Sequence, residues 1–174
     1  MPHFMKKRIA WPMMAFFLII CSGCGYRLAG GGFIHNDVTR VSVAIFENKS
    51  TESRAGISFT NELIREITAK TDTIVVDADN ATRKISGTVQ SITFSTLSRS
   101  SSEDVTERQV NARVDVVLTG TGGKVLWSVK NFSASESYDV SSNTVNDEAN
   151  KREAVDLIAE RVAERLVSQI TNDF

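Results

Sequence analysis

The chain of 174 residues has the length of a single domain, and 24% of its residues are charged and 41% hydrophobic. The formal net charge of -1 does not fit a nucleic-acid-binding protein, and two Cys with two His are too few for an ordinary zinc site. Aromatic residues, at 7%, are sufficient for one modest core, and the low Cys count excludes a disulfide scaffold.

The N-terminal segment has the pattern of a secretory signal peptide. Three basic residues at positions 6–8 precede an unbroken apolar run over 9–20, the order of a basic n-region and an apolar h-region. A membrane-spanning helix needs roughly 20 apolar residues, so this run is too short, and Pro12 is unfavourable inside such a helix. We therefore predict that residues 1–23 are a signal sequence; an uncleaved N-terminal membrane anchor is the alternative.

Cys24 follows this run in a pattern that resembles a bacterial lipobox. Ser22 and Gly23 supply the small residues before a cysteine that is lipidated, whereas Cys21 follows two isoleucines, which are too bulky for such a cleavage site. Cys21 itself stands where lipoboxes usually carry Leu. We expect Cys24 to become the first residue and to carry a covalent lipid, with no other cofactor. Several acyl chains make membrane anchoring essentially permanent.

Residues 24–37 are rich in glycine and lack periodicity, so the sequence predicts a tether. As a flexible coil it spans roughly 20 Å, which keeps the following domain close to its membrane. An Asp directly after the lipidated Cys commonly retains a bacterial lipoprotein at the inner membrane. Gly25 stands there instead, which favours the periplasmic face of the outer membrane. His35 is expected to be a solvated residue of this tether.

Residues 38–174 are predicted to form one α/β domain. Alternation of apolar and polar residues predicts a strand over 38–46, followed by a polar break over 47–53. A helix is expected over 54–70, with Ser53 as its N-cap. The predicted apolar face of this helix consists of Ile57, Thr60, Leu63, Ile64 and Ile67.

The middle of the chain reads as a series of strands and turns. A change in the parity of the apolar residues predicts a β-bulge near Gln90 and Ser91. The predicted elements are a short strand at 73–76, a turn at 77–80, a long strand from Lys84, a Ser-rich hairpin tip at 98–104, a half-buried strand at 110–118, a tight turn at 121–123 and a strand at 125–138.

A helix over 145–170 is predicted to end the domain. Thr144 with Asp147 three residues later resembles a capping box. Leu157 widens the apolar side of the helix, and the charged opposite side is expected to be solvated. The main apolar stripe consists of Val155, Ile158, Val162, Leu166 and Ile170.

This order predicts an α/β, or more closely α+β, fold in the form of a two-layer sandwich. Two amphipathic helices need one face of a sheet to pack against. We therefore expect both helices on one face of a mostly antiparallel or mixed sheet of four strands. The other face is then exposed or bound by a partner.

No pattern in the sequence predicts catalysis or a metal site. After cleavage one His remains, His35, and it lies in the tether, away from any nucleophile. The glycines at 30–32 follow no strand and open no helix, so they do not form a phosphate-binding loop. The acids at 77–79 resemble half of a calcium loop but lack its Gly and its distal Glu. We expect a protein without enzymatic activity.

Several segments resemble a known family. The Cys-Gly-Tyr-Arg-Leu start at 24–28, the strand and break at 43–50, the helix segment 59–63, the strand start at 123–127 and the Glu-Ser-Tyr at 136–138 are similar to those of the outer-membrane lipopolysaccharide-assembly lipoproteins, the LptE family. The resemblance implies a small sheet with two helices on one face. It also implies a lipoprotein that sits inside a large outer-membrane β-barrel as its plug and folding partner and that contacts lipopolysaccharide.

Three cations are candidates for contact with lipopolysaccharide phosphates, from their charge and placement alone. They are Arg99 in the Ser-rich tip, Arg108 on the following strand and Lys130 on the last strand. Arginine suits this role because its planar guanidinium binds phosphate in a bidentate manner. The alternative for each, which the sequence alone favours, is an ordinary surface cation.

Two other classes of lipoprotein remain open. One activates peptidoglycan synthases, but it needs a long tether to cross the periplasm, and residues 24–37 are too short for that. The other forms secretion pores by assembling into a ring. A lipoprotein with a purely structural role is a third possibility.

Overall fold

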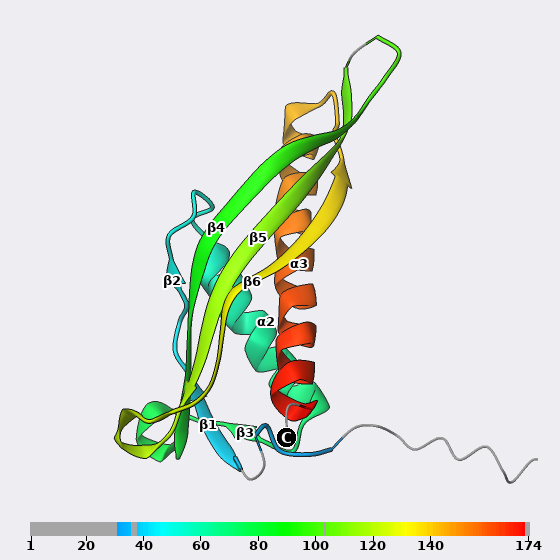
Figure 1. Cartoon of the computed structure of the whole chain (residues 1–174). Coiled ribbons are helices and arrows are strands. Elements are labelled where there is room, and N and C mark those ends of the chain that lie inside the picture. The colour runs from blue at the N-terminus through cyan, green and yellow to red at the C-terminus, as the bar shows by residue number, and fades with distance from the viewer. Residues whose placement is uncertain (1–30, 36–37, 103, 173–174) are drawn as a thin grey trace, which may run out of the picture. The chain divides into compact units, whose positions relative to one another are not determined.

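One mixed sheet and two helices make up the computed structural model, which describes residues 31–35, 38–102 and 104–172 (Figure 1). The predicted signal sequence and Cys24 lie outside these residues. The strands are β1 (Arg40–Val43), β2 (Glu47–Asn48), β3 (Ile74–Val75), β4 (Arg83–Arg99), β5 (Val105–Thr119) and β6 (Val125–Asp139). The helices are α2 (Ala55–Lys70) and α3 (Thr144–Asn172), with short 3-10 turns η1 (Ala78–Asn80) and η2 (Thr121–Gly123).

The sheet has the order β3-β1-β4-β5-β6, and β2 pairs with β4 off this path. β1 runs parallel to β3 and β4, and β2 runs parallel to β4, whereas β4, β5 and β6 form an antiparallel meander. The mixed sheet is confirmed. It has six strands rather than the expected four, because the two-residue strands β2 and β3 also pair with it. β2 lies within the predicted polar break at 47–53, because a strand of two residues has no alternation to reveal it.

Two bulges interrupt the meander. The pairing of β4 with β5 shifts between Val89 and Ser91, which confirms the predicted bulge. The pairing of β5 with β6 shifts between Val114 and Val116, where Asn131 has a positive φ of 54°. A bulge places an extra residue opposite its partner strand and increases the local twist. These two bulges lie side by side across β5 and shape the centre of the sheet.

The helix α2 buries Thr60, Leu63 and Ile67 of its predicted apolar face. Ile57, assigned to the apolar face, is 57% exposed. Arg54 rather than Ser53 occupies the N-cap position, and its side chain makes no capping hydrogen bond. The first turn is held instead by the backbone N–H of Ala55, which donates to the carbonyl of Glu52 at 3.0 Å. The buried side chains of α2 include Ala55, Phe59, Leu63 and Ile67.

The helix α3 buries its predicted stripe. Leu157, expected to widen that stripe, is 44% exposed. Asn143, not Thr144, caps the helix, because its Oδ1 accepts the backbone N–H groups of Val145 and Asn146 at 2.9 and 3.3 Å. The residues confirmed as buried are Val155, Ile158, Val162, Leu166 and Ile170.

The end of the predicted tether packs onto the domain. Ile34 is fully buried, and its N–H donates to Oγ1 of Thr73 at 3.0 Å. The N–H of His35 donates to the carbonyl of Ile170 in the last turn of α3, at 3.3 Å. Residues 31–35 are therefore part of the folded unit, which begins before the predicted boundary at residue 38.

Both helices lie on one face of the sheet, as predicted (Figure 1). On β5 the side chains toward the helices are Val110, Ala112, Val114, Val116 and Leu118, all buried. The residues between them face the opposite way, because successive side chains of a strand alternate. No helix of the described residues covers this second face.

Candidate functional site

The uncovered face of the meander carries hydroxyl, amide and charged side chains. Cross-strand pairing sets them in rows, among them Thr93–Asn111–Ser135, Ser91–Arg113–Ser133 and Thr88–Asp115. Burying such groups without hydrogen-bond partners costs free energy. This face is therefore suited to water or to a polar partner.

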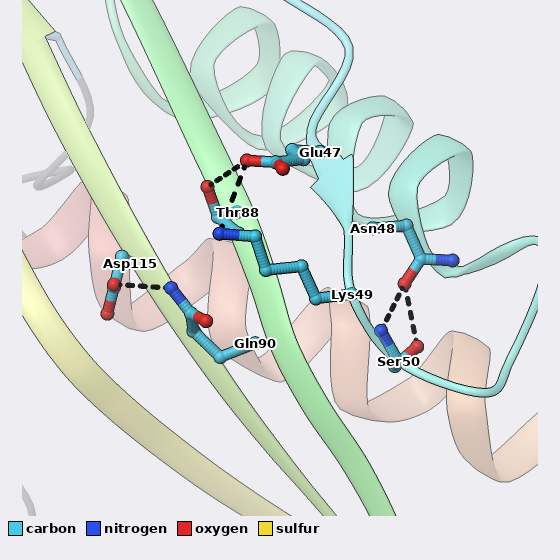
Figure 2. A network of polar contacts seen from close by, with 7 residues as sticks. All are labelled: Glu47, Asn48, Lys49, Ser50, Thr88, Gln90 and Asp115. Atoms are coloured by element: carbon cyan, nitrogen blue, oxygen red, sulfur yellow. Dashed lines mark hydrogen bonds and ion pairs between the residues drawn. The ribbon is translucent and has the colours of Figure 1, made fainter.

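Asp115 is the centre of a hydrogen-bonded cluster on this face. The side-chain amide of Gln90 donates to its Oδ2 at 2.7 Å (Figure 2), and the backbone N–H of Asn131 donates to its Oδ1 at 2.7 Å. The Asn131 N–H is the main reason that the pKa of Asp115 lies below its ordinary value, with smaller effects from Gln90 and from the charges of Lys130 and Lys49. Both bulges contribute a donor, because Gln90 is the extra residue of one and Asn131 belongs, with Lys130, to the other.

The strand β2 borders this cluster. Oε2 of Glu47 lies 3.6 Å from Nζ of Lys49 and accepts the hydroxyl of Thr88 at 3.4 Å (Figure 2). Asn48 lies on the other side of β2, where its Oδ1 accepts the N–H and the hydroxyl of Ser50 at 3.0 and 2.7 Å. One short segment thus joins the polar face to the turn that leads into α2.

Asp115→Asn is expected to reduce the loss of stability in acid. Because the pKa of Asp115 is lowered by folding, its ionised form stabilises the fold fully above the ordinary Asp pKa. This stabilisation is lost as the pH falls through the lower pKa of the folded state. Asn at this position still accepts the Asn131 N–H but does not titrate. The drop in melting temperature from about pH 7 to about pH 3 should therefore be smaller in the variant than in the wild type.

The matched control is Asp79→Asn, in the exposed turn η1 outside the cluster. In this control, the drop in melting temperature between about pH 7 and about pH 3 should be as large as in the wild type. An identical drop for the wild type and Asp115→Asn would contradict a stabilising role for the ionised Asp115.

Two of the three predicted cations lie at one end of the sheet. Arg99 is the last residue of β4 and pairs with Val105, and Arg108 on β5 pairs with Tyr138 of β6. Three residues of an extended strand separate their rows, or about 10 Å. The β5–β6 pairing ends at Glu107, so the hairpin continues past β6 as two strands (Figure 1). Arg99 therefore lies in the two-stranded end of the hairpin, and Arg108 lies just before this end, where β6 still pairs with β5.

The third cation, Lys130, lies elsewhere. It is exposed in the β6 bulge, beside Asp115. Seven residues of β5 separate Asp115 from Arg108, or about 23 Å. Arg108, moreover, shares its side of β5 with buried Val110, whereas Asp115 belongs to the uncovered face. The structure does not bring Lys130 together with the hairpin cations.

Lys151 of α3 is a cation near the hairpin that the sequence analysis did not single out. Its Nζ lies 4.8 Å from the ring centre of Phe94 and 2.8 Å from Oε1 of Glu52, whose hydrogen bond raises the pKa of Lys151. The rings of Phe94 and Tyr138 meet edge to face at 6.3 Å. These contacts join α3, β4 and the loop before α2, and no local pattern marks residues so far apart in the chain.

The described part of the chain lacks two features, a metal-ligand cluster and a membrane-spanning helix. Within it, no group of three or more His, Cys, Asp or Glu side chains is placed to hold a metal ion. Neither α2 nor α3, the helices of that part, combines the length and apolarity needed to cross a membrane.

Comparison with known proteins decides the family. The model of the LptE family, described as lipopolysaccharide-assembly, matches residues 38–170. This chain belongs to the LptE family. The match spans β1 to the last turns of α3, so the fold described above is that of an LptE family member. No curated protein matches the sequence.

Solved structures share the fold of this LptE family member. Uncharacterized lipoprotein B from Nitrosomonas europaea has 19% identity and a TM-score of 0.58, covering 84% of this chain and 90% of its own. A protein of Xanthomonas campestris assigned to family DUF330 has 12% identity and a TM-score of 0.51, with coverages of 80% and 89%. A putative lipoprotein from Caulobacter crescentus has 14% identity and a TM-score of 0.50, with coverages of 72% and 87%. At these identities the likeness concerns the fold alone.

Within the described residues, the segments that resemble the LptE family place residues in the core of this member. Phe46, Trp127 and Tyr138 are buried in the core. Asn48 forms the turn after β2, and its Nδ2 donates to the carbonyl of Glu52 at 2.8 Å. The family resemblance thus rests on residues that hold the two layers together, and the polar face has to be identified from the sheet pairing.

Proposed function

We propose that this LptE family member is an outer-membrane lipoprotein that acts as plug and folding partner of a large lipopolysaccharide-assembly β-barrel. The family match over 38–170 carries the proposal. The lipobox at Cys24 supplies the membrane anchor, and Gly25 after it favours the outer membrane. The role is binding and positioning, without catalysis.

The polar face of the meander supports a position within a barrel. The interior of an outer-membrane barrel is polar, in contrast to its lipid-facing outside. The rows that contain Asn111, Arg113 and Asp115 offer hydrogen-bonding groups along the sheet. In the proposed complex this face meets the barrel wall or the water that fills the lumen.

We further propose that the hairpin tip contacts lipopolysaccharide. Arg99 and Arg108 lie about 10 Å apart along the strands, a spacing that allows both to reach phosphates of one molecule. Lys130 is the weaker candidate, because it lies far from this tip beside Asp115. The proposal therefore places the principal contact at the two arginines.

Charge reversal at the tip tests this contact. Arg99→Glu with Arg108→Glu is expected to weaken lipopolysaccharide binding by about tenfold or more, because two attractive charges become repulsive. The measurement is a titration of the purified full chain with lipopolysaccharide in an uncharged detergent. Arg99→Glu alone, at an exposed position, should give part of the effect and guards against misfolding at half-buried Arg108.

Lys84→Glu with Lys124→Glu is the matched control. Both lysines are exposed and lie at the opposite end of the strands, so the pair makes the same change in net charge. If both double variants weaken lipopolysaccharide binding equally, net charge alone governs binding. That result would contradict the proposed contact at the hairpin tip.

A further inference from the structure

A groove of ≈ 520 Å³ lies where the rows of the meander meet the edge of β6 and the middle of α3. Three arginines line it: Arg113 from β5, and Arg161 and Arg165 from α3. The two helix residues are four apart, which sets them on the same side of the helix. The groove therefore concentrates positive charge on a chain whose formal net charge is -1.

The three arginines of the groove differ in their contacts with other residues. Arg161 is held in place, because its Nη1 lies 2.6 Å from Oε2 of Glu136 and donates to the carbonyl of Ser135 at 3.1 Å. Arg113 and Arg165 are exposed and form no ion pair or hydrogen bond within the described residues. Two guanidinium groups thus remain available beside one that is already fixed.

Neighbouring acids do not neutralise the groove. Glu136 pairs with Arg161, and Glu160 pairs with Arg65 of α2 at 2.9 Å. Glu164 lines a separate shallow hollow, with Phe132, to which Arg165 also contributes. Among the described residues, Arg113 and Arg165 therefore form no ion pair with an acidic side chain.

The floor of the groove is rich in small polar groups. It includes the hydroxyls of Ser91, Thr93 and Ser133 and the amide of Asn111. Hydroxyl and amide groups both donate and accept, which suits the hydroxyls of a sugar. Arginine donates only, and its fork matches the oxygens of a phosphate. The combination selects a ligand that carries both kinds of group.

We propose that this groove is a second binding site, for a phosphate-bearing sugar. Arg113 and Arg165 hold the phosphate, and the hydroxyl and amide rows hold the sugar. The site is separate from the hairpin tip, since five residues of β5, or about 17 Å, lie between the rows of Arg108 and Arg113. That the sugar belongs to lipopolysaccharide rests on the proposed function, whereas the site itself does not.

Titration with soluble probes tests the site. The full chain in an uncharged detergent should bind glucose 1-phosphate saturably, inorganic phosphate more weakly and glucose hardly at all. Arg113→Gln and Arg165→Gln should each weaken glucose 1-phosphate binding about tenfold, because each removes charge-assisted hydrogen bonds. Both positions are exposed, so the variants should melt at the wild-type temperature.

Arg152→Gln is the matched control, an exposed arginine of α3 that does not line the groove. It should leave binding unchanged. The absence of saturable binding, or equal effects of all three single variants, would overturn the site.

Competition identifies the source of the sugar. Lipopolysaccharide that displaces glucose 1-phosphate supports a lipid-borne ligand, and a failure to displace it overturns that source. Loss of the proposed barrel complex would be seen by co-purification and would leave the glucose 1-phosphate titration unaffected. The two proposals can therefore fail separately.

Discussion

Phe46→Ala is expected to lower the free energy of unfolding by about 3–5 kcal/mol, the usual cost of removing a buried phenyl ring. Phe46 is only 3% exposed and lies between β1 and β2, at the junction of the sheet with α2. Its backbone N–H donates to the hydroxyl of Thr60 in α2 at 2.9 Å. Its ring packs over Gly87 of β4, at a position where a Cβ atom would overlap the ring. Urea denaturation of the full chain measures the change.

A double-mutant cycle tests whether the ring and the glycine are coupled. Gly87→Ala alone is expected to cost about 1–3 kcal/mol, since the added methyl group collides with the ring of Phe46. In the Phe46→Ala background the same change should cost much less, because the ring has gone. Ile45→Ala, at the neighbouring residue that is 73% exposed, should change stability by less than about 0.5 kcal/mol. Strict additivity of the two core changes would contradict this packing.

Ile158→Ala is the second change with a large expected effect, about 2–5 kcal/mol of unfolding free energy. Ile158 of α3 is fully buried in the hydrophobic core. Removal of its side chain leaves a cavity, because the surrounding structure relaxes only partially. The same urea titration applies, and an unchanged slope would show that the loss concerns the native packing.

Leu157→Ala is the control for Ile158→Ala, because both remove an aliphatic side chain from adjacent positions of α3. Leu157 is 44% exposed, so its loss should cost less than about 1 kcal/mol. A larger effect at Leu157 than at Ile158 would mean that α3 packs in a different rotation about its axis.

The meander could be predicted from the sequence because its pattern is local. The alternation over 110–118 predicts which side of β5 is buried, and the change of parity near Gln90 predicts the bulge. The stripe of α3 is equally regular, and all five of its predicted residues are buried. These elements follow from side-chain periodicity along one segment.

Elements that depend on distant contacts could not be predicted in the same way. β2 pairs only through Glu47 and Asn48 with β4, and two residues carry no periodicity. In the sequence, Ile34 lies within a glycine-rich spacer. In the structure it is buried, and its N–H bonds to Thr73, which comes much later in the chain. The prediction that Ile57 of α2 is buried is wrong for the same reason, because the packing partner decides which apolar residues are covered.

The candidate sites follow the same division. The sequence positions of Arg99 and Arg108 put them in or beside the predicted hairpin, and the strand pairing brings both to one end of the sheet. The pairing also separates Lys130 from them, which the sequence does not reveal. The groove brings Arg113 together with Arg161 and Arg165, which come about 50 positions later in the chain. It could not be predicted from the sequence, because it depends on the packing of α3 beside the edge of β6.

Co-purification from outer membranes tests the central claim most directly. A tag after Phe174 allows the full chain to be isolated in mild detergent, and the co-eluting proteins are then identified. The account predicts a stable one-to-one complex with a large β-barrel. A complex with a peptidoglycan synthase, or a ring of identical subunits without a barrel, would contradict it.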